Sequence, residues 1–568
     1  MKRRNHLWKN CIALLLPVSL LLTGCGAKDA EEPDAEETPN AILGQPLAET
    51  KAADDLFSMT YAPDETINPY SGNSVSNSAL TGLLYETLFN VAPDYTFTPS
   101  RLIRSYESSN GGQSWSFTVN TDVQFSDGSY LTAQDVVSSI RCAMQSSHYR
   151  PRLSNYSVIM GVSTLDDESF LVTLYTPNLL FPALLTIPVL QSGNYKTPCP
   201  IGTGLYKMEG AELWNGTETD DEEASDEEAG PQPAEPITPK LVLNAFHPRA
   251  GDAALKEICL RPHSDIESSI SEFEDGLIDL MENDPNGISA IGYSSSNEVR
   301  SYLVPSMYYL GFNMKHSFVQ VPQYRYAISY LVDRKTIVDK IMSGNGKAAA
   351  SPMCPDCAWY DSSIDDVIHY APQSALELFA RSACDDYDED GKLEYMVTGV
   401  PMEISLVFVV CRSNPGKVSI ARRIAADLEA VGITVTLQEL TWEGYMYALM
   451  AGEYDLYLAE TILTADFDLR ALLSESGTLN FGGISDEGYV DRITAYLAAD
   501  DSSRAAACSN MCQYIAANAP IIPIAFESRS VVTHRGVVSG IELSPYNIFY
   551  NIADWKLSLP DVGDDEIK

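Results

Sequence analysis

The residues of this chain with the closest chemistry-bearing spacing are cysteines. Cys354 and Cys357 form a C-P-D-C pair with the gap of metal-binding and redox motifs, and Cys508 with Cys512 is the other close pair. The second spacing places both thiols one turn apart on a helix. A zinc site needs four such ligands close together, and cysteines scattered over a long chain are not a disulfide scaffold. The pattern favours a local disulfide or free thiols over a bound metal.

Carboxylates alternate along the segment DYDEDGKLE, residues 386–394. The oxygens of Asp386, Asp388 and Asp390 before a glycine turn are the start of a calcium-binding loop. The twelfth position is Val397 instead of the glutamate that binds calcium through both oxygens. The alternative is a solvated turn between a helix and a strand, and the sequence leaves both interpretations open.

The short motifs of common enzyme classes are absent from the sequence, which contains no HExxH, GxSxG, GxxxxGK[ST] or GxGxxG. Its histidines are scattered, so no metal or catalytic cluster is visible. Asp466 and Asp468 are the carboxylate pair that a secreted hydrolase of peptides or glycosides would use. We expect no enzyme and no cofactor, and keep the hydrolase as an alternative.

Cys25 ends a segment with the features of a secretory signal. Lys2, Arg3 and Arg4 precede an apolar stretch over 11–22 that is too short for a membrane span. The small residues around Cys25 resemble the signal of bacterial lipoproteins, in which this thiol carries a diacylglycerol. The resemblance implies that residues 1–24 are removed and that a lipid holds the protein on the extracellular face of the membrane, the periplasmic side if the host has an outer membrane. The alternative is an ordinary signal peptide with an incidental cysteine.

The chain as a whole is strongly acidic. The charges give 37 − 78 = −41, which repels nucleic acid and anionic lipid headgroups. Residues 25–53 are rich in acidic residues, alanine and proline, which predicts a flexible linker. Residues 209–239 are acidic and proline-rich, which predicts a solvated insertion between strands. No second apolar run reaches membrane length.

Local patterns predict the elements that position these residues. Apolar residues at helical spacing predict an amphipathic helix over 77–89, and residues 115–119 alternate as a half-buried strand. Residues 126–129 (SDGS) form a turn. Thr132 then caps a helix, with Asp135 as its capping-box partner.

In this order the elements resemble the family 5 extracellular solute-binding proteins, the peptide- and nickel-type receptors of ABC importers. The resemblance runs through nearly the whole mature chain. Its blocks are LLYETLF (83–89), WSFTVNTDVQFSDGSYLTAQDVVSSI (115–140), PIGTGLYKM (200–208), FEDGLIDL (273–280) and YYLGFNMKHSFVQVPQYRYAISYLVDRKTIVDKIM (308–342).

The resemblance implies an α/β, two-lobed Venus-flytrap fold of the type II periplasmic-binding-protein class. It implies a lobe I over 54–300, with an extra subdomain over 90–198, and a lobe II over 301–521. Residues 522–560 then return to lobe I.

Ligand contacts are implied where the family motifs match. In peptide-binding members an aspartate in an A-D-Y/F motif pairs with the α-amino group of the ligand, and the match here is Asp466, between Thr464 and Phe467. An ammonium group taken out of water needs such a charged partner. The alternative role for Asp466 is a helix cap. Trp442 matches a family aromatic near the cleft, although a tryptophan in this setting is by default part of the core.

The motif departs from the family at several positions. Leu463 replaces a tryptophan, and Glu460 stands where many peptide binders carry an arginine. Glu527, after Phe526 in the last crossing segment, replaces a common aromatic. Because arginine binds a carboxylate through two parallel hydrogen bonds, its loss points away from generic recognition of peptide termini. We expect an acidic cleft that suits a cationic peptide, an amine or a sugar-like solute.

The main hypothesis is a lipid-anchored receptor that captures a peptide or other small solute by lobe closure. It would deliver the solute to the permease subunits of an ABC importer, which work with ATPase subunits. The alternatives are the secreted hydrolase and a surface adhesion or signalling receptor with the same fold.

Overall fold

The computed structural model describes residues 56–153, 158–210, 239–263, 265–287, 290–292 and 294–559. The predictions for Cys25, for the linker 25–53 and for nearly all of the insertion 209–239 lie outside the described residues. Within the described ranges, no helix is both long enough and apolar enough to cross a membrane.

The largest sheet has the strand order β11-β20-β12-β19-β17-β18, and β13 pairs with β20 at its side. Its strands are β11 (Leu280–Asn283), β12 (Asn297–Phe312), β13 (Gly346–Ala348), β17 (Ser405–Cys411), β18 (Thr434–Leu440), β19 (Leu456–Ile462) and β20 (Ile521–His534). The parallel pairing of β17 with β18 and β19 buries apolar residues on both faces of this half of the sheet.

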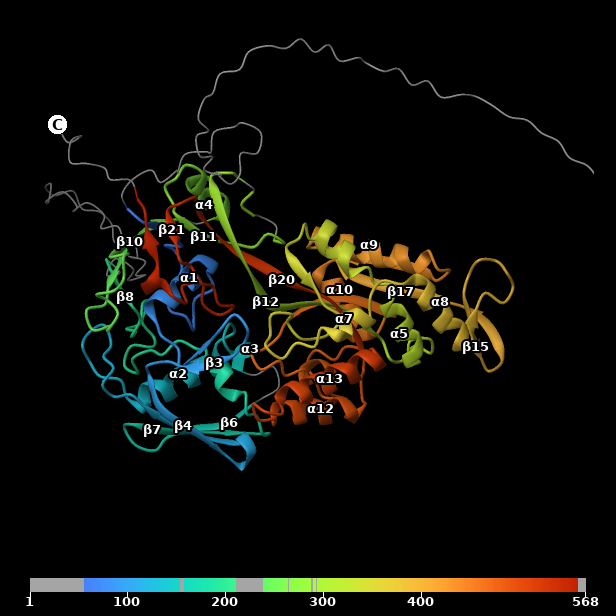
Figure 1. The fold of residues 1–568 in the computed structure, drawn as a ribbon, viewed down its shortest axis with the longest axis horizontal. Helices are drawn as coiled ribbons and strands as arrows, with labels where there is room; N and C mark the ends of the chain where they lie inside the picture. Colours follow the sequence, from blue (N-terminus) through green and yellow to red (C-terminus); the bar gives the residue numbers. More distant parts are fainter. Residues whose placement is uncertain are drawn as a thin grey trace, which may run out of the picture. The chain divides into compact units, whose positions relative to one another are not determined.

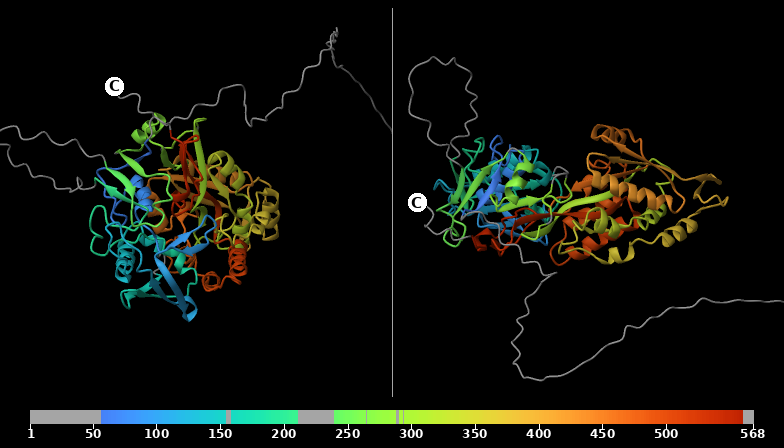
Figure 2. Two further views of the ribbon diagram at one scale, coloured as in Figure 1. Left: turned by 60° about the vertical axis from the view of Figure 1, so that its left-hand side comes forward. Right: turned by 90° about the horizontal axis from the view of Figure 1, so that it is seen from above.

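The long strands β12 and β20 run side by side through this sheet, as Figure 1 shows, and Figure 2 shows the same pair from two further directions. Their antiparallel register breaks between Leu303 and Met307, where β12 bulges opposite Glu527. On one side of this break β20 also pairs with β13, and on the other side it pairs with β11. The two strands therefore link the elements before residue 300 to those after it.

Smaller sheets flank this one. A four-stranded sheet has the order β1-β10-β9-β8, and another has the order β4-β5-β7-β6. Their strands are β1 (Ser58–Tyr61), β4 (Ile103–Ser109), β5 (Ser114–Val119), β6 (Ile159–Thr164), β7 (Ser169–Leu174), β8 (Tyr206–Glu209), β9 (Lys240–Leu243) and β10 (Glu257–Pro262). The short strands are β2 (Phe89–Val91), β3 (Phe97–Pro99), β14 (Cys384–Asp385), β15 (Glu394–Val397), β16 (Val400–Glu403), β21 (Val538–Ser539) and β22 (Lys556–Leu557).

Helices pack around these sheets. Before the crossing strands they are α1 (Val75–Leu84), α2 (Ala133–Gln145), α3 (Arg150–Leu153) and α4 (Ile266–Glu274). Between β12 and β20 they are α5 (Pro322–Ser329), α6 (Arg334–Thr336), α7 (Ser363–Val367), α8 (Pro372–Arg381), α9 (Pro415–Glu429), α10 (Trp442–Ala451), α11 (Arg470–Leu473), α12 (Glu487–Leu497) and α13 (Arg504–Asn518).

The local predictions around residues 115–140 are confirmed. In β5 the side chains of Trp115, Phe117 and Val119 are buried and those between them are partly exposed, so the alternation follows the pleat. At the start of α2 the backbone N–H of Thr132 donates a hydrogen bond to Asp135 Oδ2 at 2.8 Å. This is the reciprocal contact of a capping box, and it fixes where the helix begins.

The predicted helix over 77–89 is wrong in its second half, because α1 ends at Leu84. Residues 86–89 instead pair with residues 185–189: the Val189 N–H donates to the Glu86 carbonyl at 2.9 Å, and Thr87 bridges Pro188. The apolar residues in this stretch suit a buried strand as well as a helix face, and pairing with a distant segment decides between the two.

The PIGTG motif passes against the end of α1. The Gly204 N–H donates to the Leu84 carbonyl at 3.0 Å. A Cβ on Gly204 would lie 2.4 Å from the Leu83 carbonyl oxygen, and one on Gly202 would lie 2.3 Å from that of Leu84. Two glycines are therefore needed for the close approach of these backbones.

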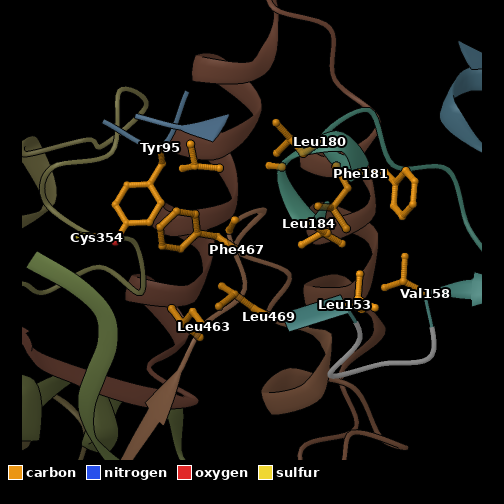
Figure 3. Packing of buried hydrophobic residues seen from close by; sticks show 14 of the residues in the cluster. Tyr95, Leu153, Val158, Leu180, Phe181, Leu184, Cys354, Leu463, Phe467 and Leu469 are labelled. Carbon is orange, nitrogen blue, oxygen red and sulfur yellow. The ribbon is translucent and has the colours of Figure 1, made fainter. Parts of the chain in front are cut away.

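The largest hydrophobic cluster contains residues from 88–189 together with residues from 303–526. Figure 3 shows one place where they meet: Tyr95 lies beside Phe467 and Cys354. The Tyr95 and Phe467 rings are 4.9 Å apart in an edge-to-face arrangement, which adds about 0.5–1.5 kcal/mol to the burial of the two rings. Two further clusters lie under α5, α8 and α9 and around the β1 sheet.

Candidate functional site

Asp466 is fully buried in the turn between β19 and α11. Its Oδ1 accepts a hydrogen bond from the Thr464 hydroxyl at 2.5 Å, and its Oδ2 accepts one from the Asn178 amide at 2.8 Å. Burial, and next the charge of Asp468, raise the pKa of Asp466 to about 6. Asn178 therefore satisfies the oxygen of Asp466 that Thr464 does not bind.

Asp468 and Arg470 form a buried ion pair beside it, with exposed fractions of 5% and 3% for the two side chains. Arg470 Nη2 lies 2.6 Å from Asp468 Oδ2, and Arg470 Nη1 donates to the Thr176 hydroxyl at 2.7 Å. The two carboxylates suggested for a hydrolase therefore do not act as a free pair, because Asp468 is bound to Arg470.

Glu460 and Glu527 lie on the main sheet, near the crossing of β12 and β20. Lys417 Nζ is 2.6 Å from Glu460 Oε2, and the Ser306 hydroxyl donates to Glu460 Oε1. Burial opposes ionisation of Glu460, but the Lys417 charge and these hydrogen bonds outweigh it and lower its pKa. Glu527 is 4% exposed, and burial followed by the charges of Glu460 and Asp284 raises its pKa to about 8.

The remaining predicted ligand residues are apolar or weakly polar, and two of them are in contact, because the Phe467 N–H donates a hydrogen bond to the Thr464 carbonyl at 2.9 Å. Phe526 is buried in the core, as are Phe467 and, almost completely, Thr464. Phe467 has a φ of 52°, a left-handed conformation that a phenylalanine rarely adopts. Trp442 is 59% exposed at the first turn of α10, so its default assignment to the core is wrong.

A cavity of about 870 Å³ lies elsewhere, among α1, α3 and the segment 544–553. It extends to the crossing strands, where Tyr302, Val304 and Arg529 line it. Ile462, at the end of β19, lies in its wall, but the seven predicted ligand residues do not. The cavity is large enough for a small peptide or a comparable solute.

Four arginines line this cavity, and three have carboxylate partners. The paired arginines are Arg101 with Glu86 at 2.8 Å, Arg249 with Asp554 at 2.6 Å and Arg529 with Glu282 at 3.7 Å. The fourth, Arg152, forms no ion pair with a carboxylate of the described residues. Its guanidinium lies 4.8 Å from the ring centre of Tyr149 and 5.9 Å from that of Tyr546.

These contacts position Arg152 without neutralising it. A guanidinium stacked on aromatic rings can still donate hydrogen bonds within its own plane, in the geometry that matches a carboxylate. His148 lines the same cavity, and burial together with the Arg152 charge lowers the pKa of its imidazole. The cavity thus offers one positive charge and a neutral histidine to a ligand.

Sequence reasoning missed Arg152 because no motif marks it. The only signal was its setting, the basic stretch HYRPR in a strongly acidic chain. Such a stretch is typical of a solvated surface. Only the fold places Arg152 in a cavity next to Tyr546, which is almost 400 positions away in the sequence.

The structure brings the carboxylates of the calcium-loop candidate together. Carboxylate oxygens of Asp386, Asp388, Asp390 and Glu394 all lie within 4.8 Å of one another, so Glu394 joins the three predicted calcium ligands. The Gly391 N–H donates to Asp386 Oδ2 at 2.9 Å, as it would in either a calcium loop or a solvated turn. Calcium binding remains a prediction.

The two close cysteine pairs are buried and free. Cys508 and Cys512 lie one turn apart on α13, as predicted. Cys357 belongs to the same hydrophobic cluster, and the Ser509 hydroxyl donates to Asp361 at 2.5 Å, which holds α13 against the segment that follows Cys357. All four thiols belong to the largest hydrophobic cluster and are core residues.

Comparison with solved structures defines the class of protein. The unliganded open form of the periplasmic murein tripeptide-binding protein MppA has a TM-score of 0.68, 18% sequence identity, and coverage of 90% of this chain and 99% of its own. A nickel ABC transporter protein from Bacillus halodurans has a TM-score of 0.66, 18% identity, and coverage of 87% and 97%. The fold is the two-lobed α/β fold of periplasmic binding proteins.

Sequence comparison gives the family. Residues 99–477 match the model of the bacterial extracellular solute-binding proteins, family 5, and the chain belongs to this family. The oligopeptide-binding protein AppA of Bacillus subtilis is 21% identical over 479 residues, which cover 80% of each chain. The nickel-binding periplasmic protein of Escherichia coli is 22% identical over 478 residues, which cover 79% of this chain and 85% of that protein.

Proposed function

We propose that this protein is the solute-binding component of an ABC importer, anchored outside the cell by a lipid on Cys25. Membership of family 5 supports the transport role, and the relatives named for oligopeptides and nickel indicate a peptide or another small solute. The lipid anchor rests on the sequence around Cys25, and delivery to permease and ATPase subunits rests on the family.

The observation that carries the ligand assignment is Arg152, the cavity arginine without a carboxylate partner among the described residues. The ligand supplies the missing anionic group, most simply a carboxylate, and Arg152 binds it through two parallel hydrogen bonds. This revises the expectation of an acidic cleft. Glu460 is already paired with Lys417, and Glu527 is held neutral by its surroundings.

Capture follows from closure of the two lobes. A ligand shifts the equilibrium toward the closed state only by the affinity that it has for that state in excess of the open one. The cavity reaches Ile462 and Val304, so a solute held by Arg152 also touches the elements that follow the first crossing strand. Asp466 stays a candidate partner for a ligand ammonium group, provided that the ligand displaces Asn178.

The test is calorimetric titration of the full mature protein with a tripeptide that has a free C-terminal carboxylate and with its amidated form. The solute that co-purifies with the protein, identified by mass spectrometry, is titrated in the same way. Loss of one charged hydrogen-bonded contact, worth about 1.5–3 kcal/mol, lowers affinity about tenfold to a hundredfold in Arg152→Gln. Arg150→Gln is the matched control, because Arg150 is exposed on the same short helix.

Three outcomes overturn parts of the proposal. Wild-type affinity in the Arg152→Gln variant excludes Arg152 as the anchor of the ligand. Turnover of a titrated peptide by the wild-type protein supports the hydrolase. A protein that binds no small solute from the growth medium, yet binds a surface partner, supports the adhesion or signalling role.

A further inference from the structure

Glu527 occupies the point at which the crossing strand β20 changes partners. Before it, Ala525 and Phe526 pair with β12 and β13, and after it, residues from Ser530 onward pair with β11. Opposite Glu527 the register of β12 breaks between Leu303 and Met307, while on its other side Glu527 pairs with Gly346 of β13. Glu527 therefore lies where β20 passes from one set of strand partners to the other.

The sheet register places the Glu527 carboxyl on the same face as a second carboxylate. Tyr308 on β12 is directly opposite Glu460 on one side and Ala525 on the other. Directly opposed residues share a face, and so do residues two apart on one strand. Glu527, two residues after Ala525, therefore lies on the face that carries Glu460, Tyr308 and Ser306.

The charged groups around Glu527 come from every element packed against it. The charges of Glu460 from β19 and of Asp284, which follows β11, raise the pKa of Glu527, and the charge of Arg529 on β20 opposes them. Lys417 from α9 is committed to Glu460 at 2.6 Å, and Lys347 from β13 is paired with Asp356 at 3.2 Å. Tyr308 from β12 is a neutral phenol whose pKa is raised by burial and then by Glu460 and Glu527.

None of the basic side chains in the described part of the chain forms an ion pair with Glu527 within 4 Å, and its side chain is 4% exposed. Arg529 is 3.7 Å from Glu282, and its buried Nε has no hydrogen-bond partner there. A carboxylate buried without a donor and next to other carboxylates is strongly disfavoured, whereas the protonated acid donates its own hydrogen bond to a neighbour. Two carboxyl groups that share one proton are the stable arrangement.

We propose that Glu527 holds a proton shared with Glu460 or Asp284 at neutral pH, and that its release at alkaline pH loosens the crossing strands and weakens lobe closure. The site takes a proton from solvent and returns it there, and no other group changes its bonds. Asp284 precedes β12 and Glu460 follows it, so the shared proton connects residues on both sides of the crossing strands. The inference rests on the proposed function only in treating these strands as the hinge of closure.

The sign of the pH dependence follows from the raised pKa of about 8. A carboxyl whose pKa is higher in the folded state than in the unfolded chain contributes stability that is complete below the unfolded value. That contribution is lost as the pH rises through the folded value. The wild-type protein therefore becomes less stable between pH ~5 and pH ~9, and each unit of pKa difference changes the folding equilibrium about tenfold.

The first experiment measures the thermal midpoint of the ligand-free mature protein from pH 5 to pH 9.5, with Glu527→Gln as the variant. Glutamine keeps the shape of the protonated acid and cannot ionise, so we expect a flatter profile and a higher midpoint than wild type at pH 9. Glu460→Gln removes one neighbouring charge and should move the wild-type transition to lower pH. Identical profiles for wild type and Glu527→Gln would overturn the proposal.

The second experiment measures small-angle scattering of the same proteins at pH 6 and pH 9. We expect the radius of gyration of the wild type to rise at pH 9 and that of Glu527→Gln to stay constant. A midpoint profile that depends on Glu527 without any change in scattering would overturn the link to closure but not the proton site. If sodium or calcium chloride at pH 9 restores the wild-type midpoint and not that of the variant, a cation and not a proton is the occupant, which overturns the proposal.

Discussion

The Asn178 amide donates a hydrogen bond to Asp466 Oδ2 at 2.8 Å, although 288 positions separate the two residues. Neighbouring hydrogen bonds join the same two parts of the chain: Arg470 Nη1 donates to the Thr176 hydroxyl, and the Leu179 N–H donates to the Leu497 carbonyl at 2.7 Å. The segment 176–179 is thus bound at three points to α11, α12 and the turn before them.

Asn178→Ala should destabilise the protein by about 1–3 kcal/mol, because it leaves a buried carboxylate oxygen without its donor. The pKa of Asp466, already raised to about 6, should rise further. Stability linked to a raised carboxyl pKa is lost as the pH rises through it, so the penalty should be larger at pH 8 than at pH 4.5. Urea denaturation at both pH values measures this. A double-mutant cycle with Asp466→Ala provides the control, and additive effects would contradict a direct interaction.

Arg470→Leu should cost about 3–5 kcal/mol, because it leaves the buried Asp468 carboxylate without its cation. The double variant Arg470→Leu with Asp468→Leu should recover much of this loss, since no buried charge remains. The matched control is Lys335→Leu, which removes an exposed pair with Asp339 and should change stability little, because solvent screens exposed charges. Chemical denaturation gives all three values, and equal losses at the two sites would show that burial of the pair is irrelevant.

Gly204→Ala should destabilise the protein by about 1–3 kcal/mol, because the new methyl group would lie 2.4 Å from backbone atoms of α1 that cannot move without unwinding the helix end. Gly193→Ala is the control, since a Cβ there meets nothing within 4 Å. The difference between the two midpoints in denaturant is the measurement. Equal stability of both variants would mean that the PIGTG segment can shift away from α1.

Cys25→Ala should abolish incorporation of labelled fatty acid and release the protein from the membrane fraction. The reason is that Cys25 is the thiol at the end of the apolar signal stretch, flanked by small residues. Metabolic labelling and fractionation measure the result. The control is Cys11→Ala, whose cysteine lies inside the apolar stretch, and continued labelling of the Cys25 variant would refute the assignment.

The sequence predicts those structural features that depend on contacts between residues close together in the chain. The capping box of Thr132 and Asp135, the alternation of β5 and the spacing of Cys508 and Cys512 on one helix depend on local geometry, and the structure confirms them. The resemblance to the family extends the prediction from these local features to the fold, because the family motifs occur in the same order along the chain.

The features that the sequence could not predict depend on contacts between segments far apart in the chain. Residues 86–89 leave the helix because residues 185–189 offer a strand partner. Asp466 lies between β19 and α11, but no residue near it in the sequence indicates that Asn178 forms a hydrogen bond with it. Arg152 becomes a candidate ligand contact only because its neighbours in space, within the described part of the chain, supply aromatic rings and no paired carboxylate.

The place of β20 in the main sheet has a consequence for the order of events during biogenesis. This strand spans Ile521–His534, yet it inserts between β11 and β12, which are complete more than 200 residues earlier in synthesis. Until β20 is made, the edges of β11 and β12 with which it pairs stay open, and pairing at such sequence separation is slow. Almost the whole chain is therefore synthesised before its central sheet can close.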